Sequence, residues 1–222
     1  MEKIRMIIAD DHAVVREGLR FLIATEPGLD LVAEAVDGQD ALEKIILYQP
    51  DIVLLDLVMP IKSGIQVIED ITQRGLSTRV LVLSSFSEDE RVFPAIKSGA
   101  FGYLLKDTPT DTLLQAIRDV YHGESAIHPT IARILIKLIH QPGENLPAEE
   151  TFSEQEVDVL RYIARGFTNR EIAEQMRIEE REVRADTSLI LEKLHRANRK
   201  QAAINSSQNG GEVDLSGNGS AT

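Results

Sequence analysis

The sequence contains no cysteine among its 222 residues. This absence excludes a disulfide framework, a thiolate metal site and catalysis by a cysteine nucleophile. Long apolar runs are also missing. The start, MEKIRMIIADD, lacks the apolar segment of a signal peptide, and no run approaches the roughly 18 apolar residues of a membrane span. We therefore expect a cytoplasmic protein with no membrane partner.

An excess of basic charge is missing as well. The chain has 24 Lys and Arg against 36 Asp and Glu, so its net charge is −12. This balance argues against a polyanion-binding surface over the whole molecule. Residues 151–205, however, hold ten cations and ten acids, so the excess acid lies outside this segment. A local basic face there is compatible with the composition.

Short apolar runs alternate with longer amphipathic stretches from residue 4 to about residue 120. Within the longer stretches, apolar residues recur at spacings of three and four, as on one face of a helix. Repeats of strand then helix predict an α/β domain with a five-stranded, doubly wound parallel sheet of the flavodoxin-like type. The expected strands cover residues 4–9, 29–35, 51–57, 79–85 and 101–105.

The pattern changes after residue 125. We expect residues 126–149 to form a linker with a connecting helix, because HQPGENLPAEE is polar and contains two prolines and a glycine. Residues 150–205 show only helical periodicity. The tail, residues 206–222, is rich in Ser, Gly and Asn and is expected to be disordered.

Two capping boxes mark helix starts in the second unit, at SEQE (153–156) and at TNRE (168–171). A short helix, a tight turn and a longer helix at EREVRADTSLILEKLH follow, with a last short helix at RKQAAI. This order is typical of a helix-turn-helix unit. We therefore predict an all-α helix-turn-helix domain behind the α/β domain.

Polar side chains close four of the expected strands, where a parallel α/β sheet binds its ligands. Clustered carboxylates repel one another unless a cation lies among them, and oxygen ligands suit Mg²⁺. An aspartate can also attack phosphorus, while the metal and a lysine neutralise the phosphoryl oxygens and a serine donates a hydrogen bond. Each residue alone has an ordinary structural explanation, but together they favour phosphoryl chemistry. They are Asp10, Asp11, Asp56, Ser84 and Lys106.

The segments ADD, DLVMPIKSG, LVLSS and GAFGYLLKD match the pattern of the receiver domain in two-component response regulators, which residues 1–125 resemble. The resemblance implies that Asp56 accepts a phosphoryl group from a sensor histidine kinase. It implies that Ser84 and Lys106 bind this group and that Tyr103 is a switch aromatic that turns inward when Ser84 moves. The implied Mg²⁺ ligands are Asp11, Asp56, the backbone carbonyl of Val58 and, chiefly through water, Asp10. We interpret His12 as a partly exposed first-turn residue rather than a metal ligand.

The second unit resembles the LuxR-type helix-turn-helix of NarL/FixJ-family regulators. GFTNREIA matches the family pattern G-x-S/T-N-K/R-E-I-A closely, and Val183 and Arg184 fit its recognition helix. The two resemblances together cover nearly the whole chain to about residue 205. They imply a transcription regulator that binds DNA and forms a homodimer on activation. Candidate DNA contacts are Arg170, Arg184, Lys193 and Arg199.

Several residues depart from the family pattern where DNA is expected to be touched. Glu182 replaces a threonine and Asp186 a histidine, while Gln155 replaces an arginine in the first helix. Carboxylates facing the groove oppose binding to phosphates, although they can accept hydrogen bonds from cytosine N4. One alternative is therefore a phosphorylation-dependent regulator whose divergent helix-turn-helix domain binds protein instead of DNA. Another is simply a packing helix in this position.

An enzyme that uses Asp56 as a nucleophile is a further alternative. A phosphatase or phosphotransferase of this kind would need a general acid two residues after the nucleophile, and that position is Val58. We therefore predict that the protein is not an enzyme.

Overall fold

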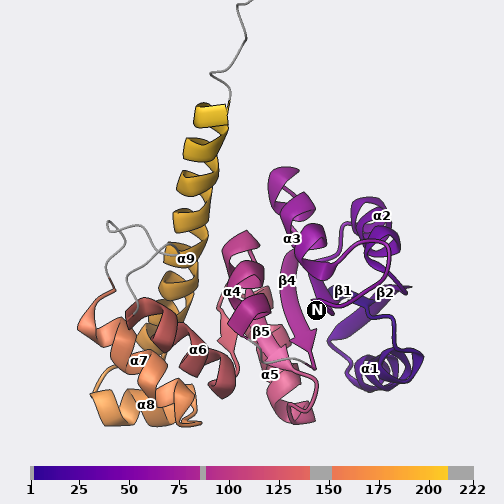
Figure 1. Cartoon of the computed structure of the whole chain (residues 1–222). Coiled ribbons are helices and arrows are strands. Elements are labelled where there is room, and N and C mark those ends of the chain that lie inside the picture. The colour runs from indigo at the N-terminus through magenta and orange to yellow at the C-terminus, as the bar shows by residue number, and fades with distance from the viewer. Residues whose placement is uncertain (1–2, 86–88, 141–151, 210–222) are drawn as a thin grey trace, which may run out of the picture.

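A computed structural model describes residues 3–85, 89–140 and 152–209 (Figure 1). The described strands form one fully parallel sheet in the order β2-β1-β3-β4-β5-β6. Five of them confirm the expected strands, so the α/β prediction is correct. They are β1 (Ile4–Ala9), β2 (Leu29–Ala35), β3 (Ile52–Leu55), β4 (Arg79–Ser84) and β5 (Gly102–Leu105).

The sixth strand, β6 (Ala126–Ile127), was not expected. It pairs with β5 through Gly102 and Tyr103, in the segment that the sequence suggested was a linker. A strand of two residues is too short to show an apolar alternation, so the sequence carries no pattern for it.

Helices cover both faces of the sheet because alternate strand residues point to opposite sides. In β1, Met6 and Ile8 pack with α1 and α5, whereas Ile7 packs on the other side with α2, α3 and α4. These helices are α1 (Ala13–Thr25), α2 (Gly38–Tyr48), α3 (Gly64–Gln73), α4 (Asp89–Ser98) and α5 (Thr110–Tyr121).

The described residues after β6 form four further helices: α6 (Pro129–His140), α7 (Glu154–Ala164), α8 (Asn169–Met176) and α9 (Glu180–Asn209). Both predicted capping boxes are present, with Ser153 capping α7 and Thr168 capping α8. Helix α6 packs against α7 and belongs to the same apolar cluster as the helical unit. The helix-turn-helix prediction is therefore correct for α8 and α9.

Helix α9 is longer than expected. The predicted recognition helix and the predicted last short helix form one continuous helix, which includes residues 206–209 of the expected disordered tail. Residues 210–222 lie outside the described part of the chain. No proline or glycine separates the two predicted helices, so nothing in the backbone chemistry ends the first one.

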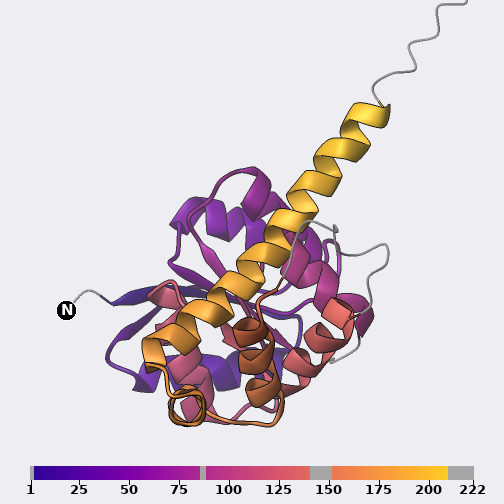
Figure 2. The same cartoon turned by 90° about the vertical axis from the view of Figure 1, so that its left-hand side faces the viewer.

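Helix α9 also joins the two units. It crosses the side of the α/β domain and packs against α4 (Figures 1 and 2). Helix α4 contains Pro94 in its interior, at a position where proline removes one backbone hydrogen bond. No described helix is long and apolar enough to cross a membrane.

Candidate functional site

The sheet brings the predicted acidic residues together at its carboxyl edge. Asp10 follows β1 and Asp56 follows β3, and the Asp56 amide donates to the Ala9 carbonyl at 2.9 Å. Both aspartates are buried, at 2% and 4% exposure, whereas Asp11 is exposed. Burial removes these carboxylates from water, so their charges require partners inside the protein.

Lys106 supplies the first partner. Its Nζ lies 2.6 Å from Asp10 Oδ2 and 2.7 Å from Asp56 Oδ2. Its main chain is fixed by a 2.9 Å bond from the Lys106 amide to the Ser84 carbonyl. Burial alone lowers the pKa of Lys106, but its hydrogen bonds to both aspartates and their charges outweigh burial and raise that pKa. The ammonium therefore stays charged between the two carboxylates.

One ammonium does not balance the three carboxylates of the pocket, and the negative charge that remains makes them a candidate cation site. Asp10, Asp11, His12 and Asp56 each place one ligand atom within 4.8 Å of the others. Asp10, Asp11 and Asp56 supply the oxygen atoms that Mg²⁺ prefers, so this donor set fits the expected ion. The His12 side chain is 66% exposed, and its Nδ1 lies 2.7 Å from Asp11 Oδ1, so it also has the ordinary partner of a surface imidazole.

The loop after Asp56 packs closely against the nucleophile's backbone. The Val58 amide lies 3.4 Å from Asp56 Oδ1. Gly64 begins α3 at the end of DLVMPIKSG, and its amide donates to the Leu57 carbonyl at 3.0 Å. A Cβ at Gly64 would lie 2.2 Å from the Asp56 carbonyl oxygen, a distance that no side chain tolerates. The glycine of the motif thus lets α3 begin directly against Asp56.

Ser84 and Tyr103 lie on adjacent strands beside the pocket. Both side chains are fully buried. Burial raises the pKa of Tyr103, a hydrogen bond with the Ser84 side chain opposes this effect, and the charge of Asp56 adds to it. The phenol is therefore neutral, turned into the protein and bonded to the residue expected to bind the phosphoryl group.

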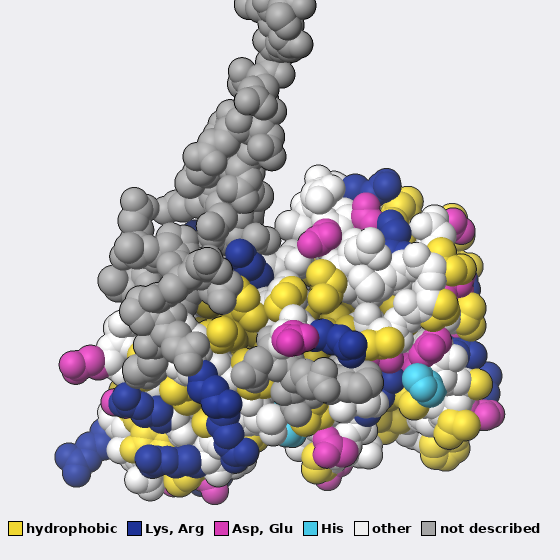
Figure 3. All heavy atoms as spheres, viewed as in Figure 1, with side chains coloured by type: hydrophobic (Ala, Val, Ile, Leu, Met, Phe, Trp, Pro, Cys, Tyr) yellow, Lys and Arg dark blue, Asp and Glu magenta, His cyan; other side chains and the backbone are white. Residues whose placement is uncertain are grey.

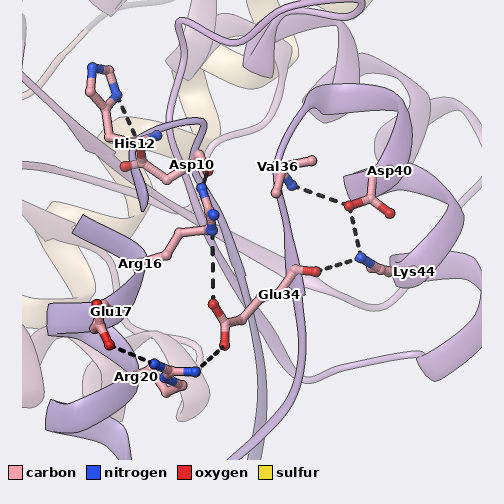
Figure 4. Close-up of polar contacts among 9 residues, drawn as sticks. All are labelled: Asp10, His12, Arg16, Glu17, Arg20, Glu34, Val36, Asp40 and Lys44. Carbon is pink, nitrogen blue, oxygen red and sulfur yellow. Dashed lines mark hydrogen bonds and ion pairs between the residues drawn. The ribbon is translucent and has the colours of Figure 1, made fainter. Parts of the chain in front are cut away.

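The sequence did not single out Arg16, which the structure places at this pocket (Figure 4). Its Nη1 donates to the Asp10 carbonyl at 2.8 Å, and its Nε lies 3.8 Å from Glu34 Oε2. The sequence did contain a signal for this residue. The helix dipole disfavours positive charge near the N-terminus of a helix, so a cation at this position of α1 indicates a specific partner.

The candidate DNA contacts whose side chains the structure describes have different partners. The Arg184 guanidinium faces the α/β domain and lies 2.8 Å from Glu124 Oε2 and 3.4 Å from Asp119 Oδ1. It also pairs with Glu180, one turn earlier on α9, at 2.5 Å. Hydrogen bonds to Glu180 and Glu124 raise the pKa of Arg184. One turn further along α9, Ser188 Oγ accepts from the Ser125 amide at 2.9 Å.

Lys193 instead forms an ion pair within the helical unit. Its Nζ lies 2.7 Å from both carboxylate oxygens of Glu156, whose side chain is 3% exposed. The ammonium therefore balances a buried carboxylate, and its role as a DNA contact stays a prediction. Arg170 is 81% exposed and pairs with Glu174. Arg199 lies on α9, and its side chain is outside the described atoms.

Two departures from the family pattern contact each other. Gln155 Nε2 donates to Asp186 Oδ2 at 2.8 Å, joining α7 to α9. The Asp186 carboxylate therefore has a partner within the helical unit, whereas Glu182 is exposed.

Figure 3 shows Lys and Arg side chains gathered over the part of the molecule that contains α7 and α8. The exposed cations there are Arg161, Arg165, Arg170 and Arg177.

This parallel sheet, with its acidic pocket and its helix-turn-helix unit, defines a receiver-type regulator. Residues 6–118 match the family of response regulator receiver domains, and residues 150–205 match bacterial regulatory proteins of the luxR family. The chain belongs to the response regulators that join these two domains, a family of transcription regulators and not of enzymes.

Similar proteins cover nearly the whole chain. The transcriptional regulatory protein DegU of Brevibacillus brevis is 36% identical, over 94% of this chain and 94% of the relative. The uncharacterised transcriptional regulatory protein YhcZ of Bacillus subtilis is 41% identical, over 90% of this chain and 94% of the relative. Relatives named as transcription regulators favour DNA over the alternative of a protein-binding helical domain.

Solved structures agree with this assignment. The receiver domain of the putative response regulator NarL from Mycobacterium tuberculosis is 38% identical, with a TM-score of 0.54 over 55% of this chain and 99% of that one. The response regulator ChrA of a haem-sensing two-component system is 29% identical, with a TM-score of 0.54 over 91% of this chain and 99% of that one.

Proposed function

We propose that Asp56 accepts a phosphoryl group from a sensor histidine kinase and that its phosphorylation controls DNA binding by α9. The observation that carries this proposal is the bridge that Lys106 Nζ makes between Asp10 and Asp56, at 2.6 and 2.7 Å. A buried nucleophilic carboxylate beside a fixed ammonium, with two more carboxylates nearby, is the arrangement that phosphoryl transfer to aspartate requires.

In the proposed transfer, an Asp56 carboxylate oxygen forms a bond to phosphorus while the bond from phosphorus to the kinase histidine nitrogen breaks. Lys106 then pairs with the new phosphoryl oxygens, and the Ser84 hydroxyl donates to one of them. Asp10, Asp11, Asp56 and the Val58 carbonyl are the residues that would hold Mg²⁺. When bound, this ion neutralises charge on the phosphoryl oxygens.

We further propose that the signal passes through Ser84 and Tyr103 to the contacts of α9. Ser84 would exchange its bond with Tyr103 for one to the phosphoryl group. Helix α9 lies against α4, and its Arg184 is held by Asp119 and Glu124 of the receiver. An arginine held by receiver carboxylates cannot meet a DNA phosphate, so release of α9 from the receiver would precede DNA binding by a homodimer.

The experiment is fluorescence anisotropy of a labelled duplex DNA across a salt series, with and without acetyl phosphate and Mg²⁺. We expect phosphorylation to tighten binding at least tenfold. Salt should weaken it steeply, because each displaced phosphate counterion contributes a log–log slope of about −0.9. The Asp56→Asn variant should lose both the phosphoryl label and the tightening. Asp30→Asn, which removes a similar carboxylate from exposed β2 surface, is the matched control.

Two results would contradict the proposal. Label and tightening that persist in Asp56→Asn would move the acceptor to another residue. A labelled protein that binds no DNA even at low salt would show that the acidic residues of α9 have abolished DNA affinity.

A further inference from the structure

Arg16 contacts the backbone that joins the two acidic residues of the pocket (Figure 4). Its Nη1 donates to the Asp10 carbonyl at 2.8 Å. That carbonyl belongs to the peptide plane between Asp10 and Asp11. On the other side of Asp10, the amide donates to the Ala35 carbonyl of β2 at 3.2 Å. The polar groups on both sides of Asp10 are therefore tied to fixed parts of the fold.

Arg16 occupies this position against the local electrostatics. It is the fourth residue of α1, whose first turn contains no acidic residue, and the positive end of the helix dipole disfavours a cation there. The side chain is also only 16% exposed. A charge in such a place needs compensation. Glu34 provides it, at 3.8 Å from the Arg16 Nε.

Glu34 is itself held in place from helix α2. Lys44 Nζ donates to the Glu34 carbonyl at 2.6 Å and pairs with Asp40 at 2.8 Å. Asp40 in turn accepts from the Val36 amide at 3.2 Å. The chain of contacts thus runs from α2 through β2 to Arg16 and ends at the Asp10 carbonyl. Arg16 thus connects α2 and β2 to the acidic turn.

We propose that Arg16 is a positioning residue for the cation site of the pocket, an inference that rests on the proposed function of Asp10, Asp11 and Asp56. By fixing the peptide plane between Asp10 and Asp11, the guanidinium fixes the direction in which the Asp11 side chain leaves the backbone. Asp11 needs such help because it is exposed and has no tie to Lys106 of the kind that holds Asp10.

The sign of the effect separates positioning from simple electrostatics. A cation close to the pocket repels Mg²⁺, so removal of the Arg16 charge should tighten Mg²⁺ binding if charge alone mattered. Loss of positioning should weaken it, because the carboxylates then lose configurational order that binding must restore. Weaker binding after removal of a positive charge has no electrostatic explanation.

The test is isothermal titration calorimetry of the full chain with Mg²⁺ alone. We expect Arg16→Gln to weaken Mg²⁺ binding roughly three- to tenfold, the range of one lost hydrogen bond. Arg16→Lys, which keeps a donor and the charge, should recover most of the affinity. Arg20→Gln is the matched control, because Arg20 Nη1 also lies 3.9 Å from Glu34 and makes no contact with Asp10 that the structure shows. It should bind Mg²⁺ with unchanged or higher affinity.

A second measurement distinguishes positioning from a role in folding. The initial rate of phosphorylation by acetyl phosphate should fall in Arg16→Gln at low Mg²⁺ and recover at saturating Mg²⁺, with little change in thermal unfolding. If Arg16→Gln does not fold, Arg16→Met serves instead, since its unbranched stem keeps the packing while the charge and the donors are lost.

Unchanged or tighter Mg²⁺ binding in folded Arg16→Gln or Arg16→Met would overturn the inference and leave the function of Asp56 intact. Failure of the proposed function would look different. In that case the wild-type chain would bind no Mg²⁺ in the same titration and Asp56→Asn would keep its label.

Discussion

The receiver pocket and the inner face of α9 hold similar sets of charges in opposite ways. In the pocket, Lys106 lies between Asp10 and Asp56, with Asp11 beside them, and all of them follow strands of one sheet. On α9, one arginine meets three carboxylates that come from two domains. The first cluster is fixed by backbone hydrogen bonds between strands, whereas the second depends on an interface. A charge cluster within one sheet is suited to bind a ligand, and a cluster across an interface is suited to be separated.

The largest effect is expected where a charge pair is buried within one domain. Lys193→Met leaves Glu156 buried without its cation and should lower the stability of the helical unit by about 3 kcal/mol. Chemical denaturation followed by circular dichroism measures this change, while acetyl phosphate labelling of Asp56 should be unaffected.

Two controls accompany this variant. Arg170→Met removes a cation from an exposed pair and should change stability by less than about 0.5 kcal/mol. The double variant Glu156→Gln/Lys193→Met removes the uncompensated charge and should regain part of the loss. A Lys193→Met protein as stable as wild type would show that this cation is not structural and would favour its predicted role as a DNA contact.

A smaller effect is expected where the charge cluster spans the interface. Glu124→Gln removes one receiver carboxylate from Arg184, so α9 should separate more readily and the unphosphorylated protein should bind DNA roughly two- to fivefold more tightly. The same anisotropy titration measures it. Glu26→Gln removes a paired receiver carboxylate at Arg118, away from these contacts, and should change nothing. Equal affinity in the two variants would mean that this pair does not restrain α9.

The smallest effect concerns His128, which precedes α6. Its Nδ1 accepts from the Thr130 amide at 3.2 Å and must be unprotonated to do so. Burial lowers the pKa of His128, the charge of Asp107 opposes this effect, and that of Arg133 reinforces it. A lowered pKa contributes stability that is present above the unfolded value near 6.5 and is lost as pH falls below it.

We therefore expect the wild type to lose less than about 1 kcal/mol of stability between pH 7.5 and pH 5.5 through this group. His128→Asn keeps a capping side chain without a titrating group and should flatten the dependence. His122→Asn, exposed at the end of α5, is the matched variant that should keep it. A slope that persists in His128→Asn would assign the pH response to other groups.

The comparison also explains what the sequence could predict. Asp10, Asp56, Ser84 and Lys106 were found because each follows or ends an apolar run, and strand order alone then brings them to one edge. The two capping boxes were found because their contacts are three residues apart. In both cases the relevant distance is fixed by a local element.

The missed features depend on which face of a helix meets which neighbour. Arg184 and Lys193 lie on one helix and carry the same charge, yet one faces the receiver and the other faces Glu156. Helical periodicity marks both as polar positions and does not say what lies opposite them. The contact between Gln155 and Asp186 was also unpredictable, since 31 residues separate them.

Pro94 affects the local stability of α4, the helix that links the two domains. Helix α4 is the receiver helix against which α9 packs, and its interior proline leaves the carbonyl one turn earlier without a helical donor. We therefore expect the free energy of locally opening α4 to be lower than that of an uninterrupted helix such as α5. If the proposed signal from the pocket reaches α9 through α4, it would pass through a helix that opens more readily, and part of the domain's own stability, not only rigid displacement, would set how far the populations of the two states shift.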